Sequence, residues 1–178
     1  RLHSDTEDQL EIRWHRQSDS LDSRRMFSPV ATKDPTAVAQ EVGAAYLTLF
    51  PAGDRHFVPR AFDWASACFT GNYKNYQPID ARYHDFEHTL QGTLCFARLL
   101  RGRHQAGGQL LLSERIFQLG LLAILLHDAG YLKTREDTEG TGAKYTLTHV
   151  KRSTEFAGGL LAELGCQPAD NTNPCDDN

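Results

Sequence analysis

The sequence has few cysteines and no long hydrophobic run, and each shortage excludes a class of protein. The four cysteines, Cys68, Cys95, Cys166 and Cys175, form no CxxC pair, which argues against a disulfide scaffold and indicates a reduced, cytoplasmic chain. The most apolar run, residues 119–126, is far shorter than the roughly 20 residues of a membrane-spanning helix. We therefore expect no association with a membrane.

An excess of basic charge is also absent. Lys and Arg number 19 and Asp and Glu number 23, which gives a formal net charge of −4. Such a chain lacks the electrostatic footprint of a nucleic-acid-binding protein, so we expect no nucleic-acid partner. Hydrophobic residues at 40% and charged residues at 24% are typical of a globular domain, and 178 residues suffice for one.

Composition divides the chain into three parts. Residues 1–34 are polar and of mixed charge, which predicts an arm or linker and no signal peptide. The first residue, Arg1, indicates either a processed chain or a piece of a longer one. Residues 35–166 form the predicted helical domain, and residues 167–178 form a polar, acidic tail.

Apolar residues recur at helical spacing across the predicted domain. The pattern predicts helices that start at Asp34-Pro35, near Tyr83, at Ser113 and near Leu147, with a loop over residues 70–82. The run from residue 116 to 126 is apolar nearly all round, which is typical of a helix buried on every side. Because no strand pattern interrupts these segments, we predict an all-α bundle of about six helices.

Two histidine-containing segments carry the chemistry. His84 and His88 are four residues apart and would share one face of a helix, although solvated or capping histidines would also fit there. His127 and Asp128 directly follow the apolar run, where an unpaired buried carboxylate would be costly. A divalent cation would compensate that charge, and the alternative is a capping pair at a helix end that reaches the surface.

Together these segments resemble the HD superfamily of metal-dependent phosphohydrolases. Tyr83-His84-Asp85-x-x-His88 is similar to the Y-H-N-x-x-H signature of the cyclic-nucleotide phosphodiesterase branch, with Asp85 in place of Asn. The apolar run into His127-Asp128 is similar to the second signature, and the resemblance covers roughly residues 40–165. It implies an HD-domain helical bundle.

The resemblance also implies roles for these residues. His88, His127 and Asp128 would bind a divalent metal ion, which could be Zn, Fe, Mn, Ni or Mg. Metal-activated water would attack phosphorus in line, and His84 would protonate the leaving alkoxide. The substrate would be a phosphorylated small molecule, and a nucleotide or cyclic nucleotide is the expected class.

The sequence departs from this family in two places. Tyr131 stands three residues after Asp128, where the phosphodiesterases carry a further histidine. The family completes its first metal site with an Asp on a later helix, whereas this chain offers only Asp170, Asp176 and Asp177 in its polar tail. Truncation or loss of that Asp are the favoured explanations.

Three further residues are candidate substrate contacts. His149 and Arg152 lie one turn apart near the start of the last predicted helix, where the resemblance suggests a phosphate contact or a secondary metal contact. Lys133 follows Asp128 by five residues and could meet a substrate phosphate. An exposed histidine and an ordinary exposed lysine are the alternatives for His149 and Lys133.

Three functions are compatible with the sequence. The first is an HD-type phosphohydrolase, most similar to a phosphodiesterase. The second is a degenerate HD domain that binds a nucleotide or a protein without turnover, which the two departures favour. The third is an unrelated helical interaction domain. The oligomeric state is left open by the sequence.

Overall fold

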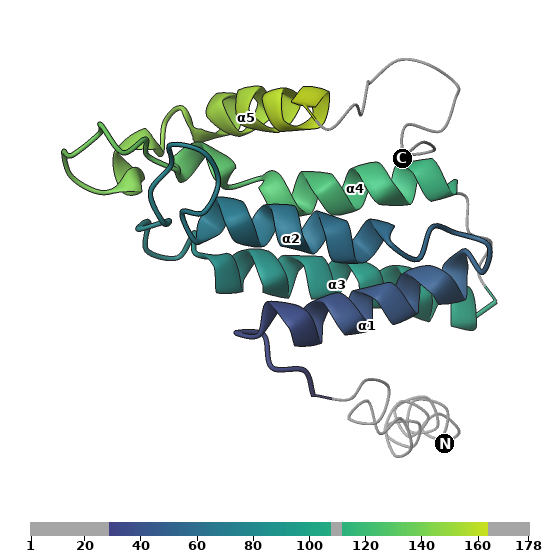
Figure 1. Ribbon diagram of the computed structural model, residues 1–178. Coiled ribbons are helices and arrows are strands. Elements are labelled where there is room, and N and C mark those ends of the chain that lie inside the picture. Colours follow the sequence, from purple (N-terminus) through teal and green to yellow (C-terminus); the bar gives the residue numbers. More distant parts are fainter. Residues whose placement is uncertain (1–28, 108–111, 164–178) are drawn as a thin grey trace, which may run out of the picture.

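The computed structural model describes residues 29–107 and 112–163, which contain five α-helices and two 3-10 turns (Figure 1). The elements in chain order are α1 (Pro35–Leu49), α2 (Phe57–Phe69), α3 (Phe86–Gln105), α4 (Glu114–Leu126), η3 (Ala129–Tyr131), η4 (Gly142–Tyr145) and α5 (His149–Glu163). Apart from an isolated bridge between Tyr76 and Thr134, these residues contain no β-structure. The all-α prediction is confirmed, whereas the HD-domain architecture and the count of about six helices stay predictions.

Side-chain caps fix where three of the helices begin. The first turn of a helix has N–H groups without a partner inside the helix, and a short polar side chain can accept from them. The Asp34 carboxylate accepts from the Thr36 N–H at 2.9 Å at the start of α1. The Ser113 hydroxyl accepts from the Ile116 N–H at 3.3 Å at the start of α4. Both starts agree with the sequence prediction.

The third cap corrects the predicted start of α3. Asp85 accepts from the backbone N–H of His88 at 2.8 Å, so α3 begins at Phe86 and not near Tyr83. Tyr83 has a φ of 65°, which is incompatible with a right-handed helix. His84 therefore lies in the loop before α3, and the prediction that it shares a helix face with His88 is wrong.

The hydrophobic core lies among α1, α2, α3 and α4. α1 packs against α2 and α3, and α4 packs against the same two helices (Figure 1). Fully buried apolar side chains come from all four, and they include Val38, Ala65, Leu90, Phe117 and Leu121. This packing fixes the end of α4, where His127 and Asp128 follow.

The prediction that α4 is buried on all sides is wrong for one side. Ile116 is 51% exposed and Leu119 is 42% exposed. The physical reason is that α5 packs mainly against η3 and touches α4 less extensively, so it leaves part of the outer face of α4 uncovered.

Polar contacts hold α5 against η3. The Ser153 hydroxyl accepts from the Gly130 N–H at 2.8 Å and donates to the His127 carbonyl at 2.5 Å. A Cβ atom on Gly130 would lie 2.1 Å from the His149 carbonyl oxygen, so only glycine permits this close approach. These contacts place the first turn of α5 beside the residues that follow α4.

Several sequence predictions concern the ends of the chain. Most of the predicted arm and all of the predicted tail, including Asp170, Asp176 and Asp177, lie outside the described residues. Within the described ranges, Cys68 and Cys95 are free thiols. No helix in these ranges combines the length and hydrophobicity that crossing a membrane would require.

Candidate metal centre

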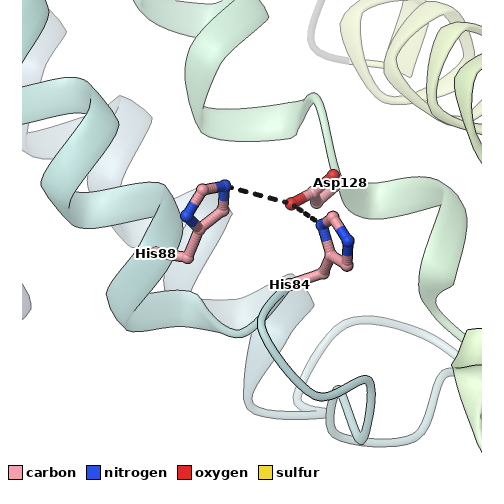
Figure 2. A group of neighbouring side chains, drawn as sticks. All are labelled: His84, His88 and Asp128. Carbon is pink, nitrogen blue, oxygen red and sulfur yellow. Dashed lines mark hydrogen bonds and ion pairs between the residues drawn. The ribbon is translucent and has the colours of Figure 1, made fainter.

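Three segments bring potential metal ligands together at one end of the helices. His84 comes from the loop before α3, His88 from the first turn of α3, and Asp128 from the residue pair that follows α4 (Figure 2). One nitrogen of each histidine and one oxygen of Asp128 all lie within 4.8 Å of one another. The His88 and His127 rings also converge as predicted, with centroids 5.6 Å apart. The Asp85 carboxylate accepts from the His88 N–H, and this cap holds His88 in the first turn of α3, beside the other ligands.

Asp128 is the centre of the arrangement, since one of its oxygens faces three imidazoles. Oδ2 lies 3.0 Å from His84 Nδ1, 3.1 Å from His127 Nε2 and 3.9 Å from His88 Nε2. The carboxylate is only 1% exposed, and a buried charge of this kind needs hydrogen bonds or a counter-charge. The histidines are more open to solvent than the aspartate, as expected at the mouth of a site.

Electrostatics keeps Asp128 ionised. Burial raises the pKa of Asp128, but hydrogen bonds with His127 and His84 lower it by more. The pKa of Asp128 is therefore lower than its ordinary value. The same hydrogen bond to Asp128 raises the pKa of His127, although burial opposes the effect. The site therefore presents an anion that attracts a cation.

The second ring nitrogen of His127 shows how its imidazole is oriented. Nδ1 lies 2.7 Å from the Ile124 carbonyl oxygen, which can only accept, so Nδ1 donates its hydrogen there. Since Nδ1 carries a hydrogen, Nε2 donates to Asp128 only when the ring is protonated, and in the neutral ring Nε2 has a lone pair that a metal ion could take. Metal-binding histidines commonly donate their other N–H to a carbonyl in this way. Imidazole nitrogens with a carboxylate oxygen are a donor set that fits a divalent transition metal.

Tyr131 connects the cluster to a fourth imidazole. Its ring stacks on His84 with centroids 4.5 Å apart and on His149 with centroids 4.7 Å apart. The Nδ1 atom of His149 donates to the Thr146 carbonyl at 2.6 Å, so this ring also leaves Nε2 unprotonated when it is neutral. The centroids of His84 and His149 are themselves 6.1 Å apart, so the three rings form one cluster. Sequence reasoning noted Tyr131 only as a departure and missed this contact.

The structure does not bring Lys133 to the cluster. Its side chain is 5% exposed, and its ammonium lies 3.3 Å from Asp80 Oδ2 and 2.5 Å from the Gly140 carbonyl. The alternative of an ordinary exposed lysine is therefore wrong, because the group is buried in an ion pair. Its partners support a role in holding the loop that contains Gly140, and they give no support to a phosphate contact.

Arg152 likewise has structural partners. Its guanidinium donates to the carbonyl of Gly130 at 2.7 Å and to that of Leu132 at 2.8 Å, and it lies 3.6 Å from the centroid of the Tyr145 ring. These contacts bind α5 to η3 and η4. Of the three residues proposed to contact substrate, only His149 lies beside the cluster.

The fold and the cluster define an all-α protein with a candidate metal centre of histidines and one aspartate. The chain belongs to the Npun_R2479-like family, whose sequence model matches residues 38–159. That range includes every residue of the cluster. Comparisons with curated proteins and with solved structures find no match. Since none of these comparisons links the chain to the HD superfamily, the resemblance to HD phosphohydrolases stays an expectation.

Proposed function

We propose that this protein is a metal-dependent hydrolase of phosphoesters. The observation that carries the proposal is the meeting of three imidazoles at one oxygen of the buried Asp128. Two of these imidazoles come from the segment with the phosphodiesterase-like signature, and the third is the His of the HD pair. Metal ligands must converge on one point, and a carboxylate with several imidazoles this close together is the arrangement that a metal site requires.

In this proposal His88, His127 and Asp128 hold one divalent metal ion. Nitrogen and carboxylate ligands suit Zn, Fe, Mn or Ni, and Mg is the alternative if phosphate oxygens complete the coordination. When bound, the metal would lower the pKa of a coordinated water and neutralise charge on the phosphate. The buried position of Asp128 strengthens its attraction for a cation.

His84 is the residue that we propose donates a proton. Its Nδ1 is paired with Asp128 at 3.0 Å and its ring stacks on Tyr131, so the imidazole is held from two directions. That orientation leaves Nε2 to exchange a proton with substrate. In the reaction, a water oxygen bonds to phosphorus, the bond to the leaving oxygen breaks, and that oxygen takes the proton from His84. The attacking water releases one proton to solvent and keeps the other on the new P–O–H group, and His84 regains a proton from solvent after the product leaves.

Metal analysis and turnover of a nitrophenyl phosphoester test the proposal together. Wild type should bind about one equivalent of a transition metal and hydrolyse the ester only when loaded. The His88→Ala variant should lose the metal and the activity. His104→Ala is the matched control, because His104 lies exposed in the last turn of the same helix, away from the cluster. A wild-type chain that binds no metal in titration would overturn the proposal.

A binding module without turnover is the second candidate. It is favoured by one observation: among the described residues, Asp128 is the sole carboxylate in the group of potential ligands. Such a site would bind metal and a phosphorylated ligand, and its nucleotide or protein partner would not be hydrolysed. Metal and ligand binding with no turnover of any phosphoester would favour this candidate over the hydrolase.

A further inference from the structure

A groove between α4 and α5 ends at the candidate metal centre. Its volume is about 560 Å³. The last turn of α4 meets the first turn of α5, so His127 and His149 lie at one end of the groove, while Leu119 and Leu161 lie toward the other. The remaining lining residues are Leu122, Ala123, Leu126, Val150, Ser153, Thr154, Ala157 and Gly158.

Apart from its two histidines, the groove offers no charged or amide side chain. Its two hydroxyls already have partners inside the protein. Ser153 is bonded to the backbone of Gly130 and His127, and Thr154 donates to the Val150 carbonyl at 3.0 Å. A ligand in the groove would therefore meet almost only hydrocarbon.

We infer that this groove binds the aliphatic chain of an amphiphilic phosphoester whose phosphate lies at the metal centre. The inference rests on the proposed function, because it assigns a substrate class to the same site. A nucleobase placed in the groove would give up hydrogen bonds to water and find no side chain to replace them, which is unfavourable. An alkyl, acyl or prenyl chain has no such groups to satisfy. This chemistry selects a lipid-like phosphoester over a nucleotide.

The edges of the groove support this choice. Leu119 is 42% exposed and Val150 is 67% exposed, so apolar surface on both walls meets water when the groove is empty. A bound hydrocarbon chain would cover that surface. The eight-residue separation of Leu119 and His127 corresponds to about 12 Å along α4, which is long enough for several methylene groups. Each methylene buried there should strengthen binding about fourfold.

Binding of alkylphosphonates of increasing chain length to the metal-loaded protein tests the inference. These probes resist hydrolysis, so the measurement does not depend on turnover. Calorimetry should give affinities that rise about fourfold per methylene until the groove is full. Adenosine monophosphate should bind more weakly than the longest alkylphosphonate.

Two neighbouring glycines provide a variant and its matched control. Gly158 lines the groove and Gly159 does not, and a Cβ atom on either would meet no other atom within 4 Å. Leucine at either position also replaces a glycine inside α5, so the effects on the helix are matched. Gly158→Leu should remove the dependence on chain length while methylphosphonate still binds. Gly159→Leu should behave as wild type.

The outcomes separate the groove from the proposed function. If affinity rises with chain length and no phosphoester is hydrolysed, the groove inference stands and the hydrolase proposal fails. If phosphoesters are hydrolysed but affinity does not depend on chain length, the inference is wrong and the hydrolase proposal stands. No measurable binding of the longest probe, or tighter binding of the nucleotide, would also overturn the inference. A wild-type dimer that Gly158→Leu converts to a monomer would assign the groove to a second copy of the chain.

Discussion

The two ends of α4 each carry a cluster of polar groups, and they differ in how fully the protein satisfies them. At the first turn, the Tyr46 hydroxyl donates to Glu114, and Gln118 donates to both at 3.3 Å. Glu114 also lies where the helix dipole favours a negative charge. Burial and this hydrogen bond raise the pKa of Tyr46, so its hydroxyl keeps its proton.

At the other end, Asp128 lies just beyond the last turn of α4, where the helix dipole disfavours a negative charge. One of its oxygens is shared by three imidazoles, so there are more potential donors than positions to receive them. The first cluster is complete as a structural feature, whereas the second would be completed by a cation. A surplus of ligating groups around one buried charge therefore identifies a site better than burial alone does.

Removing the charge at each end should give the largest difference between the two clusters. Asp128→Asn should abolish metal binding and turnover, because the anionic ligand is lost while the shape is retained. Glu114→Gln should keep both, since it changes only the first cluster. Metal content after gel filtration and nitrophenyl phosphate turnover provide the measurement. Retention of metal by Asp128→Asn would mean that Asp128 is not a ligand.

Substitution of His84 tests which role this residue has in the second cluster, around Asp128. His84→Ala should keep the metal and lose about 10²- to 10⁴-fold in turnover, which is the usual contribution of a general acid. The loss should shrink for esters with a nitrophenolate leaving group, because that group needs no proton, and the basic limb of the pH profile should disappear.

The same variant distinguishes the two possible roles of His84. Its ring belongs to the group of potential ligands as well as being the proposed acid. If His84→Ala loses metal as readily as His88→Ala, then His84 is a ligand and the proposed division of roles is wrong.

The hydrogen bonds that join α5 to η3 lie beside the second cluster, and removing them should destabilise the fold. Ser153→Ala would leave the Gly130 N–H buried without its acceptor, which should reduce the free energy of unfolding by about 1–3 kcal/mol. Thr154→Ala is the control, since that hydroxyl is exposed and bonds only within its own helix. Urea denaturation measures both, and equal stability of the two variants would contradict the expectation.

Local signals in the sequence predicted the helices better than their exact limits. Asp34-Pro35 and Ser113 are strong start signals, and both helices begin there. The sequence pattern places the start of α3 too early because Asp85 fits the signature motif as well as a capping position, and the structure shows the cap. The exposed side of α4 could not be predicted, because it depends on how much of that helix α5 covers.

The candidate site was predictable only in part, for a similar reason. The spacing of His84 and His88 and the pair after α4 are local patterns, and the structure brings these residues together. The ion-pair partner of Lys133 and the carbonyls that accept from Arg152 come from distant parts of the chain, so no local pattern could reveal that both residues are structural. The stacking of Tyr131 on the rings of His84 and His149 is equally a tertiary feature.

A third polar cluster lies in the loop before α5, and its substitution should have the smallest effect of those considered. Lys144 and Tyr145 both donate to Asp137, and the tyrosine hydroxyl lies 2.5 Å from its carboxylate. These hydrogen bonds, with that from Lys144 the largest cause, lower the pKa of Asp137 from 3.8 to about 2. Like the cluster at the first turn of α4, this one is satisfied within the protein.

The sign of its pH dependence follows from that shift. A carboxylate with a lowered pKa in the folded state stabilises the protein above its unfolded pKa of 3.8 and loses this contribution as the pH falls toward 2. Wild type should therefore melt at a slightly higher temperature than Asp137→Asn at pH 5 and above, and the difference should disappear as the pH approaches 2. Thermal unfolding at a series of pH values checks this. A difference that stays constant down to pH 2 would mean that the contribution comes from packing, since the charge of Asp137 would then have no part in it.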